Sequence, residues 1–203
     1  MSDYQILDTN ADNIDDCSLC GNKSAKNLGR RRKANWLKER YAEGLRYKVL
    51  RSEKSGDIGM IEYALGNHAW RPVEAEGYLV IHCLWVIKKH QGKGLGSLLL
   101  DSCLRDAKES KCHGVSVVTS SDSLMAEGDL FIKEGFVLVD RTIGSSEACE
   151  APYELLVKKL QKTAPDPRFI VDRERLPKRY SKGLTILVAD QCTYAAKSVE
   201  RIV

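Results

Sequence analysis

The chain has 203 residues, of which 43% are hydrophobic and 30% charged, and its formal net charge is +4. This length allows one ordinary domain plus an appendage, and the hydrophobic share suffices for a core. No apolar run approaches the roughly 20 residues that cross a membrane. The start, Met1-Ser2-Asp3-Tyr4, lacks the basic and apolar regions of a signal peptide. We therefore expect a cytoplasmic protein that does not associate with membranes.

The basic excess lies at one end of the chain. Residues 161–203 carry nine Lys and Arg against five Asp and Glu, and the remainder is neutral. Nucleic-acid binding calls for a clustered basic face. We therefore expect no nucleic-acid partner.

Hydrophobic patterning predicts the first elements in chain order. A strand over residues 4–7 precedes a helix over residues 26–43, whose apolar face uses Ala34, Leu37 and Tyr41. The one dense basic run, Arg30-Arg31-Arg32-Lys33, lies on this helix. It is interpreted either as a solvated helix face or as a contact with coenzyme phosphates or an acidic partner.

The middle of the chain alternates strands and turns. Strands are predicted over residues 46–52 and 59–64, joined by a turn at residues 55–57. A loop over residues 65–77 then leads into a strand over residues 78–86.

A second helix is predicted over residues 95–107, because apolar residues recur there at helical spacing. These are Leu95, Leu98, Leu99, Cys103, Leu104 and Ala107. The remaining elements are a strand over residues 114–120, a short helix over residues 121–134 closed by Gly135 as a C-cap, and strands over residues 136–140 and 153–158. An antiparallel front half followed by a β-α-β unit predicts a mixed sheet and the α/β class.

The last part of the chain changes character. Pro165, Pro167 and Pro177 alternate with charges over residues 162–182, which predicts a linker or an arm over the domain. A strand over residues 184–189 and a helix over residues 193–202 follow. Such a βα unit cannot bury its faces alone. Either it docks onto the core or the chain is a fragment of a longer protein.

Seven cysteines without an export signal indicate reduced thiols. Cys17-x-x-Cys20 resembles half of a zinc knuckle, but no second ligand pair follows at zinc spacing, so we expect no metal. Cys83, Cys103 and Cys112 lie in apolar contexts and are predicted to be core residues.

The stretch Gln91-Gly92-Lys93-Gly94-Leu95-Gly96 lies between an apolar run and the leucine-rich helix. This order predicts a strand, a glycine turn and a helix N-terminus, which offers unpaired backbone N–H groups to a phosphate. Glycines at these positions let a diphosphate approach the backbone. The spacing fits neither a Walker A loop nor a dinucleotide fingerprint. A glycine-rich turn that only permits close packing is the alternative.

Gln-x-x-Gly-x-Gly after Leu84-Trp85-Val86 resembles the acetyl-CoA loop of the GNAT acetyltransferases. Lys133-Glu134-Gly135-Phe136 resembles the end of the fourth helix of that family. The resemblance covers residues 1–160, which we expect to form a GNAT domain. Residues 161–203 are expected to form a linker and a partial YoaP-like segment, in which Gln191-Cys192-Thr193-Tyr194-Ala195 resembles the start of a glutaredoxin-like βα unit. Together these segments are similar to the YoaP-type acetyltransferases.

The resemblance implies the GNAT fold and acetyl-CoA as co-substrate. It also implies that the backbone of Leu84, Trp85 and Val86 runs beside the pantetheine arm. The coenzyme diphosphate is then bound by a set of six loop residues: Gln91, Gly92, Lys93, Gly94, Leu95 and Gly96.

The sequence indicates the residues that transfer protons less clearly than those that bind the coenzyme. His82 falls on the same strand face as Val80, Leu84 and Val86 by alternation and is a candidate general base, or a core histidine bonded to a backbone group. Glu74 and Glu76 are rivals that act through water.

The tyrosine that many family members use as the acid is replaced by Phe131. Tyr153 is the substitute candidate, with packing as its alternative role.

We therefore expect an enzyme that transfers acetyl from acetyl-CoA to a primary amine by direct attack in a ternary complex. A small-molecule amine is the first choice of acceptor, and a peptide N-terminus or lysine the second. The rival from another class is a weakly catalytic acyl-CoA-binding or redox-sensing module. The sequence leaves the acceptor, and homodimer formation, open.

Overall fold

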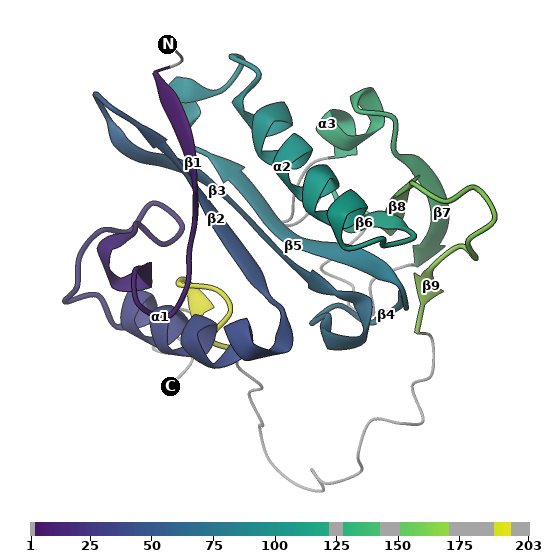
Figure 1. Cartoon of the computed structure of the whole chain (residues 1–203), viewed down its shortest axis with the longest axis horizontal. Coiled ribbons are helices and arrows are strands. Elements are labelled where there is room, and N and C mark those ends of the chain that lie inside the picture. Colours follow the sequence, from purple (N-terminus) through teal and green to yellow (C-terminus); the bar gives the residue numbers. More distant parts are fainter. Residues whose placement is uncertain (1–2, 122–127, 143–150, 171–188, 196–203) are drawn as a thin grey trace, which may run out of the picture.

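The computed structural model describes residues 3–121, 128–142, 151–170 and 189–195. Their centre is a seven-stranded sheet in the order β1-β2-β3-β5-β6-β8-β7, in which β5 and β6 are parallel and every other pair is antiparallel. Figure 1 shows α1 on one face of this sheet and α2 and α3 on the other. The mixed α/β sheet expected from the sequence is confirmed.

The strands have the following bounds: β1 Tyr4–Asp8, β2 Arg46–Ser52, β3 Gly56–Leu65, β4 Val73–Glu74, β5 Tyr78–Val86, β6 Gly114–Thr119, β7 Val137–Thr142, β8 Tyr153–Lys159 and β9 Arg168–Phe169. The helices are α1 Leu28–Arg40, α2 Leu95–Glu109 and α3 Gly128–Lys133, with 3-10 turns at Ile14–Asp16, Tyr41–Glu43, Gly66–His68 and Lys88–His90. None of the described helices is long and apolar enough to cross a membrane.

Each face of the sheet has its own core. The α2 face buries aliphatic side chains of β3 and β5 against Leu95, Leu99 and Leu104 of α2. The opposite face buries Trp36 and Leu37 of α1 against β2 and β3. On α2 the predicted apolar face is right except for Leu98, which is 40% exposed, while Leu100 is fully buried.

The basic run on α1 was interpreted as a solvated face or as a contact with coenzyme phosphates or an acidic partner, and this is wrong for two of its residues. Lys33 is fully buried and Arg30 is 5% exposed. Arg30 donates to the backbone oxygens of Asp15 and Cys17. Both cations are therefore part of the interior of the α1 face, where polar partners compensate for the lost water.

The residues after β8 fold back onto the domain. β9 pairs with β4, and the side chains of Ala164 and Phe169 pack on Val73 and Tyr78. The predicted loop over residues 65–77 therefore contains a short strand. Of the expected linker or arm, residues 162–170 lie on the sheet as an arm.

Most of the predicted strand over residues 184–189 and helix over residues 193–202 lies outside the described residues. The described piece, residues 189–195, lies beside α1 and is drawn in yellow in Figure 1. Thr193 in it is buried.

Candidate functional site

The glycine loop forms an open cradle before α2. Gly92 and Gly94 both have φ of +75°. In this left-handed region the backbone of most residues other than glycine is strained. A Cβ at either position would meet nothing within 4 Å. Gly94 is the N-cap of α2, and the first bond back to it comes from the N–H of Leu98. The N–H groups before Leu98 are thus available to an anion.

Two residues of the loop have structural contacts of their own. A Cβ on Gly96 would lie 3.1 Å from a methyl carbon of Leu130, so this glycine permits close packing with α3. The side-chain amide of Gln91 donates to the carbonyl oxygen of Val86 at 2.9 Å and ties the loop to the end of β5. Lys93 is exposed.

Strands β5 and β6 separate beside this loop. They pair only from Tyr78↔Gly114 to Ile81↔Val117, although β5 continues to Val86 and β6 to Thr119. Residues 82–86 therefore have no described strand partner on the β6 side. The gap begins at His82 and opens toward the glycine loop, which leaves backbone groups for an extended ligand to pair with.

The side chains of this stretch of β5 lie on different faces. Leu84 and Val86 belong to the α2 face. Cys83 packs on the α1 face, and the ring of Trp85 lies over the backbone of Gly21.

Alternation along β5 is interrupted at His82, where the pairing with β3 shifts between Glu62↔Cys83 and Tyr63↔Ile81. The predicted common face of His82, Leu84 and Val86 is therefore wrong, because this bulge inverts the phase. His82 instead approaches Glu62 on the α1 face, with His82 Nδ1 and Glu62 Oε1 3.7 Å apart.

His82 is 5% exposed and holds the loop before β4. Its Nε2 accepts from the backbone N–H of Trp70 at 3.1 Å, and its carbonyl oxygen accepts from Arg71 Nη2 at 2.9 Å. Burial lowers the pKa of His82 to about 4, since the opposing effect of Glu62 is smaller and the cations Arg71 and Lys33 lower it further. The imidazole is thus neutral at pH 7.

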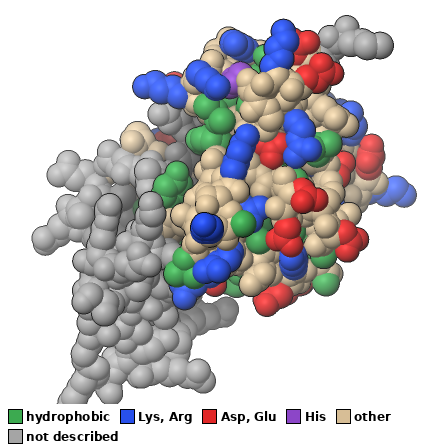
Figure 2. All heavy atoms as spheres, turned by 90° about the vertical axis from the view of Figure 1, so that its left-hand side faces the viewer, with side chains coloured by type: hydrophobic (Ala, Val, Ile, Leu, Met, Phe, Trp, Pro, Cys, Tyr) green, Lys and Arg blue, Asp and Glu red, His purple; other side chains and the backbone are tan. Residues whose placement is uncertain are grey.

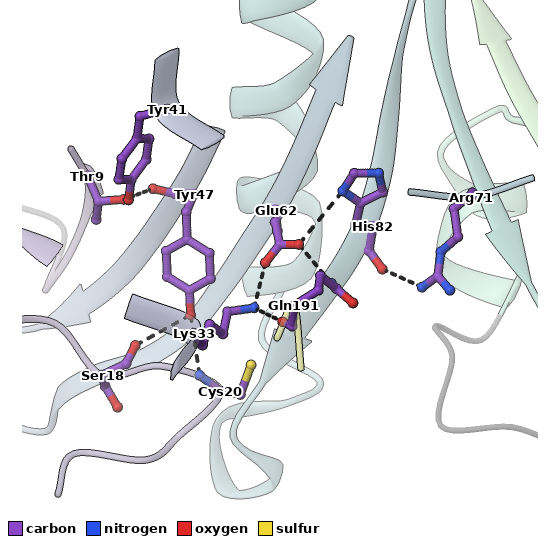
Figure 3. A network of polar contacts seen from close by, with 10 residues as sticks. All are labelled: Thr9, Ser18, Cys20, Lys33, Tyr41, Tyr47, Glu62, Arg71, His82 and Gln191. Carbon is purple, nitrogen blue, oxygen red and sulfur yellow. Dashed lines mark hydrogen bonds and ion pairs between the residues drawn. The ribbon is translucent and has the colours of Figure 1, made fainter. Parts of the chain in front are cut away.

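A buried ion pair lies next to His82 (Figure 3). Lys33 Nζ donates to Glu62 Oε2 at 2.6 Å, and neither side chain is more than 1% exposed. Gln191 of the C-terminal piece joins this pair, since its carbonyl accepts from Lys33 at 2.6 Å and its amide donates to Glu62 at 2.7 Å. Burial lowers the pKa of Lys33, but Glu62 outweighs it, so the pKa is raised and the amine stays charged.

The thiols around this pair are protonated. Burial raises the pKa of Cys20, and it raises the pKa of Cys83 to about 12. Thiols of this kind react slowly with oxidants. Cys192, on which the redox-sensing alternative rests, is exposed instead. Within the described ranges, no three His, Cys, Asp or Glu side chains are grouped to hold a metal ion.

The two aromatic positions discussed for the acid differ in setting. Phe131 is 1% exposed and packs edge-on against Phe136, with ring centroids 5.4 Å apart. Tyr153 begins β8 next to Glu154, which pairs with Thr119 at the carboxyl end of β6. Tyr153 is therefore at the end of the sheet where β5 and β6 separate, partly buried on the face of β4 and β9.

Comparisons with known proteins identify the family of this chain. Residues 24–131 match the family model described as Acetyltransferase (GNAT) family. The chain belongs to the GNAT acetyltransferase family. It is also 30% identical over 194 residues to the uncharacterized N-acetyltransferase YoaP of Bacillus subtilis (strain 168), covering 93% of this chain and 72% of that protein.

Solved structures support the same GNAT fold. YncA of Salmonella typhimurium, solved with its cofactor acetyl-CoA, has a TM-score of 0.58 at 18% identity and covers 81% of this chain and 99% of its own. The GNAT-family acetyltransferase of Streptococcus pneumoniae has a TM-score of 0.55 at 13% identity and covers 77% and 99%. The chain is thus a GNAT-family acyltransferase.

The sequence analysis of this GNAT chain missed the ion pair and the Trp70–Arg71 loop contacts. One signal was available: Glu62 is the only charged residue between Gly59 and Leu65, in a strand that is otherwise apolar. A carboxylate in such a strand needs a buried partner.

The low pKa of His82 predicts a pH-dependent stability. His82 binds its proton with a pKa near 6.5 when unfolded and about 4 when folded. Between these values the unfolded chain holds more protons, so stability is full above about pH 6.5 and falls as the pH drops toward 4, by about 3 kcal/mol. Urea unfolding at several pH values should show this loss. The loss of stability should be absent in His82→Gln and retained in His68→Gln, which changes an exposed histidine. An unchanged dependence of stability on pH in His82→Gln would show that His82 does not cause the loss.

Proposed function

We propose that the chain transfers acetyl from acetyl-CoA to a primary amine of a small molecule, by direct attack within a ternary complex. The amine nitrogen forms the new N–C bond, the thioester C–S bond breaks, and the proton of the ammonium leaves to a base. The products are the N-acetyl amine and coenzyme A.

The observation that carries the proposal is the gap between β5 and β6 leading from the glycine loop. We propose that the diphosphate binds at Gly92, Gly94 and the first N–H groups of α2. The pantetheine arm would then extend along residues 82–86 toward His82. On the α1 face next to His82, Gln191 already occupies hydrogen-bonding positions of Lys33 and Glu62. We take this as favouring a small acceptor over a peptide.

His82 and Tyr153 are the proposed base and acid. His82 is neutral at pH 7, as a base must be, but its Nε2 already accepts from Trp70. Proton transfer to it therefore requires Trp70 to release the ring. If His82 is the base, His82→Gln lowers turnover with every amine and leaves the acetyl-CoA dissociation constant unchanged.

The test is an amine panel read by release of free thiol, with acetyl-CoA binding followed by calorimetry. We expect acetyl-CoA to bind and at least one amine to be acetylated, with initial-rate lines that intersect when both substrates are varied. Parallel lines would contradict direct attack, because they indicate an acetylated enzyme. Binding of acetyl-CoA without transfer to any amine would support the acyl-CoA-binding alternative.

A further inference from the structure

Among the buried and half-buried arginines that the structure describes, Arg30 and Arg71 form no ion pair, and Arg71 has one described hydrogen bond where Arg30 has two. Lys33 is paired with Glu62 and Lys48 with Asp106. The guanidinium of Arg71 forms no ion pair with any carboxylate in the described ranges, and its described bond is the one to the carbonyl of His82. Burial lowers the pKa of Arg71, which marks a cation that has lost water without gaining an anion.

The position of Arg71 is the start of the gap between β5 and β6. His82 is the first β5 residue beyond the pairing with β6, and Arg71 binds its carbonyl. Figure 3 shows Arg71 on the side of His82 away from Glu62 and Lys33. Tyr153 contributes to the electrostatic environment of Arg71 as well, so the guanidinium lies among the candidate catalytic groups.

The loop that carries Arg71 is held in place on both sides. The indole of Trp70 packs edge-on against Trp36 of α1, with ring centroids 5.7 Å apart, and lies 5.9 Å from the guanidinium carbon of Arg40. Its backbone N–H is bound by His82 Nε2. The guanidinium is therefore positioned before any ligand arrives, which reduces the entropy lost on binding.

The charged groups around Arg71 and His82 have a positive excess. Lys33 and Arg71 are cationic, and Glu62 is the one carboxylate facing them among the described residues. His82 is neutral at pH 7, and the raised pKa values of Cys20 and Cys83 keep both thiols neutral. Glu62 is already bonded to Lys33 and Gln191. The unbalanced charge is that of Arg71.

We propose that the acceptor is an amine that carries a carboxylate, such as an amino acid, and that Arg71 binds this carboxylate while the amine faces the thioester. This rests on the proposed acetyl transfer and specifies its acceptor. A guanidinium binds a carboxylate through two parallel N–H···O bonds. Such a contact orients the amine as well as binding the substrate. In addition to its proposed role as base, His82 positions the loop, because its Nε2 holds Trp70 and its carbonyl oxygen holds Arg71.

The test compares acceptors that differ only in the carboxylate. L-methionine, L-phenylalanine, L-leucine, L-lysine and L-glutamate are assayed against their α-carboxamides. For the acids that are acetylated, we expect kcat/KM to exceed that of the amide by about ten- to a hundred-fold. In Arg71→Gln this ratio should fall to near one. Because the ratio is taken within one variant, a lower folded fraction does not affect it.

Two further variants sharpen the result. Arg71→Lys keeps the charge but loses the planar fork, so we expect an intermediate ratio. Arg40→Met removes the neighbouring guanidinium that is paired with Glu43 and Glu39, and should keep the wild-type ratio. Equal rates for acid and amide in the wild type, or an unchanged preference in Arg71→Gln, would overturn the proposal.

A failure of acetyl transfer itself is distinguished by binding. If acetyl-CoA binds but no amine in the panel is acetylated, calorimetry with the N-acetyl derivatives of the same amino acids and of their amides, in the presence of coenzyme A, replaces the rates. Tighter binding of the acids, lost in Arg71→Gln, supports the carboxylate site although the proposed function has failed. Equal or absent binding of both series overturns it.

Discussion

Glu62→Gln is expected to lower the free energy of unfolding by about 3–5 kcal/mol. The substitution keeps the shape of the side chain and removes the charge that compensates Lys33. Lys33 Nζ then remains fully buried, with the carbonyl of Gln191 and the ring of Tyr47 as its described partners. A buried ammonium without a counter-charge is among the most unfavourable groups that a fold can contain. Urea unfolding at pH 7 measures the loss.

Two controls separate this effect from a general loss of charge. Lys33→Met combined with Glu62→Leu replaces the buried pair by apolar groups, and should restore most of the stability because no charge is left uncompensated. Glu74→Gln removes the carboxylate of the exposed pair with Arg168, whose side chains are 54% and 72% exposed, and should have little effect. A Glu62→Gln protein as stable as the Glu74→Gln protein would show that Lys33 does not depend on Glu62.

The second large effect is expected at Gly94. Asn and Asp have nearly the same size, and both tolerate the left-handed backbone better than most residues. Neither meets steric resistance at the Cβ, because the space around Gly94 is open. Gly94→Asp places a carboxylate beside the proposed diphosphate position, and we expect it to weaken acetyl-CoA binding by about 100-fold or more relative to Gly94→Asn.

Calorimetric titration with acetyl-CoA gives the two dissociation constants. The difference should shrink at high salt, since screening weakens the repulsion. Equal affinities of the Asp and Asn variants would place the diphosphate elsewhere. A loss common to both variants would instead indicate that the flexibility of glycine is what the loop needs.

The glycine loop and the order of elements could be predicted from the sequence because their signals are local. Turn glycines, helix caps and hydrophobic periodicity can each be recognised from a few neighbouring residues. Gly135, predicted as a C-cap, has φ of +83° as such a cap requires. The strand over Tyr78–Val86 was predicted with the bounds that the structure gives it.

The errors concern contacts between distant residues. The face of His82 was predicted by simple alternation, and a bulge opposite β3 inverted it. Lys33 was placed among exposed residues because its neighbours in sequence are basic, whereas its environment is set by Glu62, which is 29 positions away. Arg71 could not be predicted as a functional residue, because a single arginine in a loop belongs to no recognisable motif. Its significance comes from the absence of a carboxylate partner for its guanidinium among the described residues.

The C-terminal piece packs directly against the backbone of α1 at Gly29, where the residue has no side chain. A Cβ on Gly29 would lie 1.9 Å from the carbonyl oxygen of Thr193, so alanine there would displace residues 189–195 from α1. The backbone at Gly29 is helical, and alanine would favour the helix by up to about 1 kcal/mol. Helix stability and docking thus oppose each other at this position. Whatever holds or releases the C-terminal piece acts directly on the hydrogen bonds of Gln191 to Lys33 and Glu62, and so on the electrostatic balance beside the proposed acetyl-transfer site.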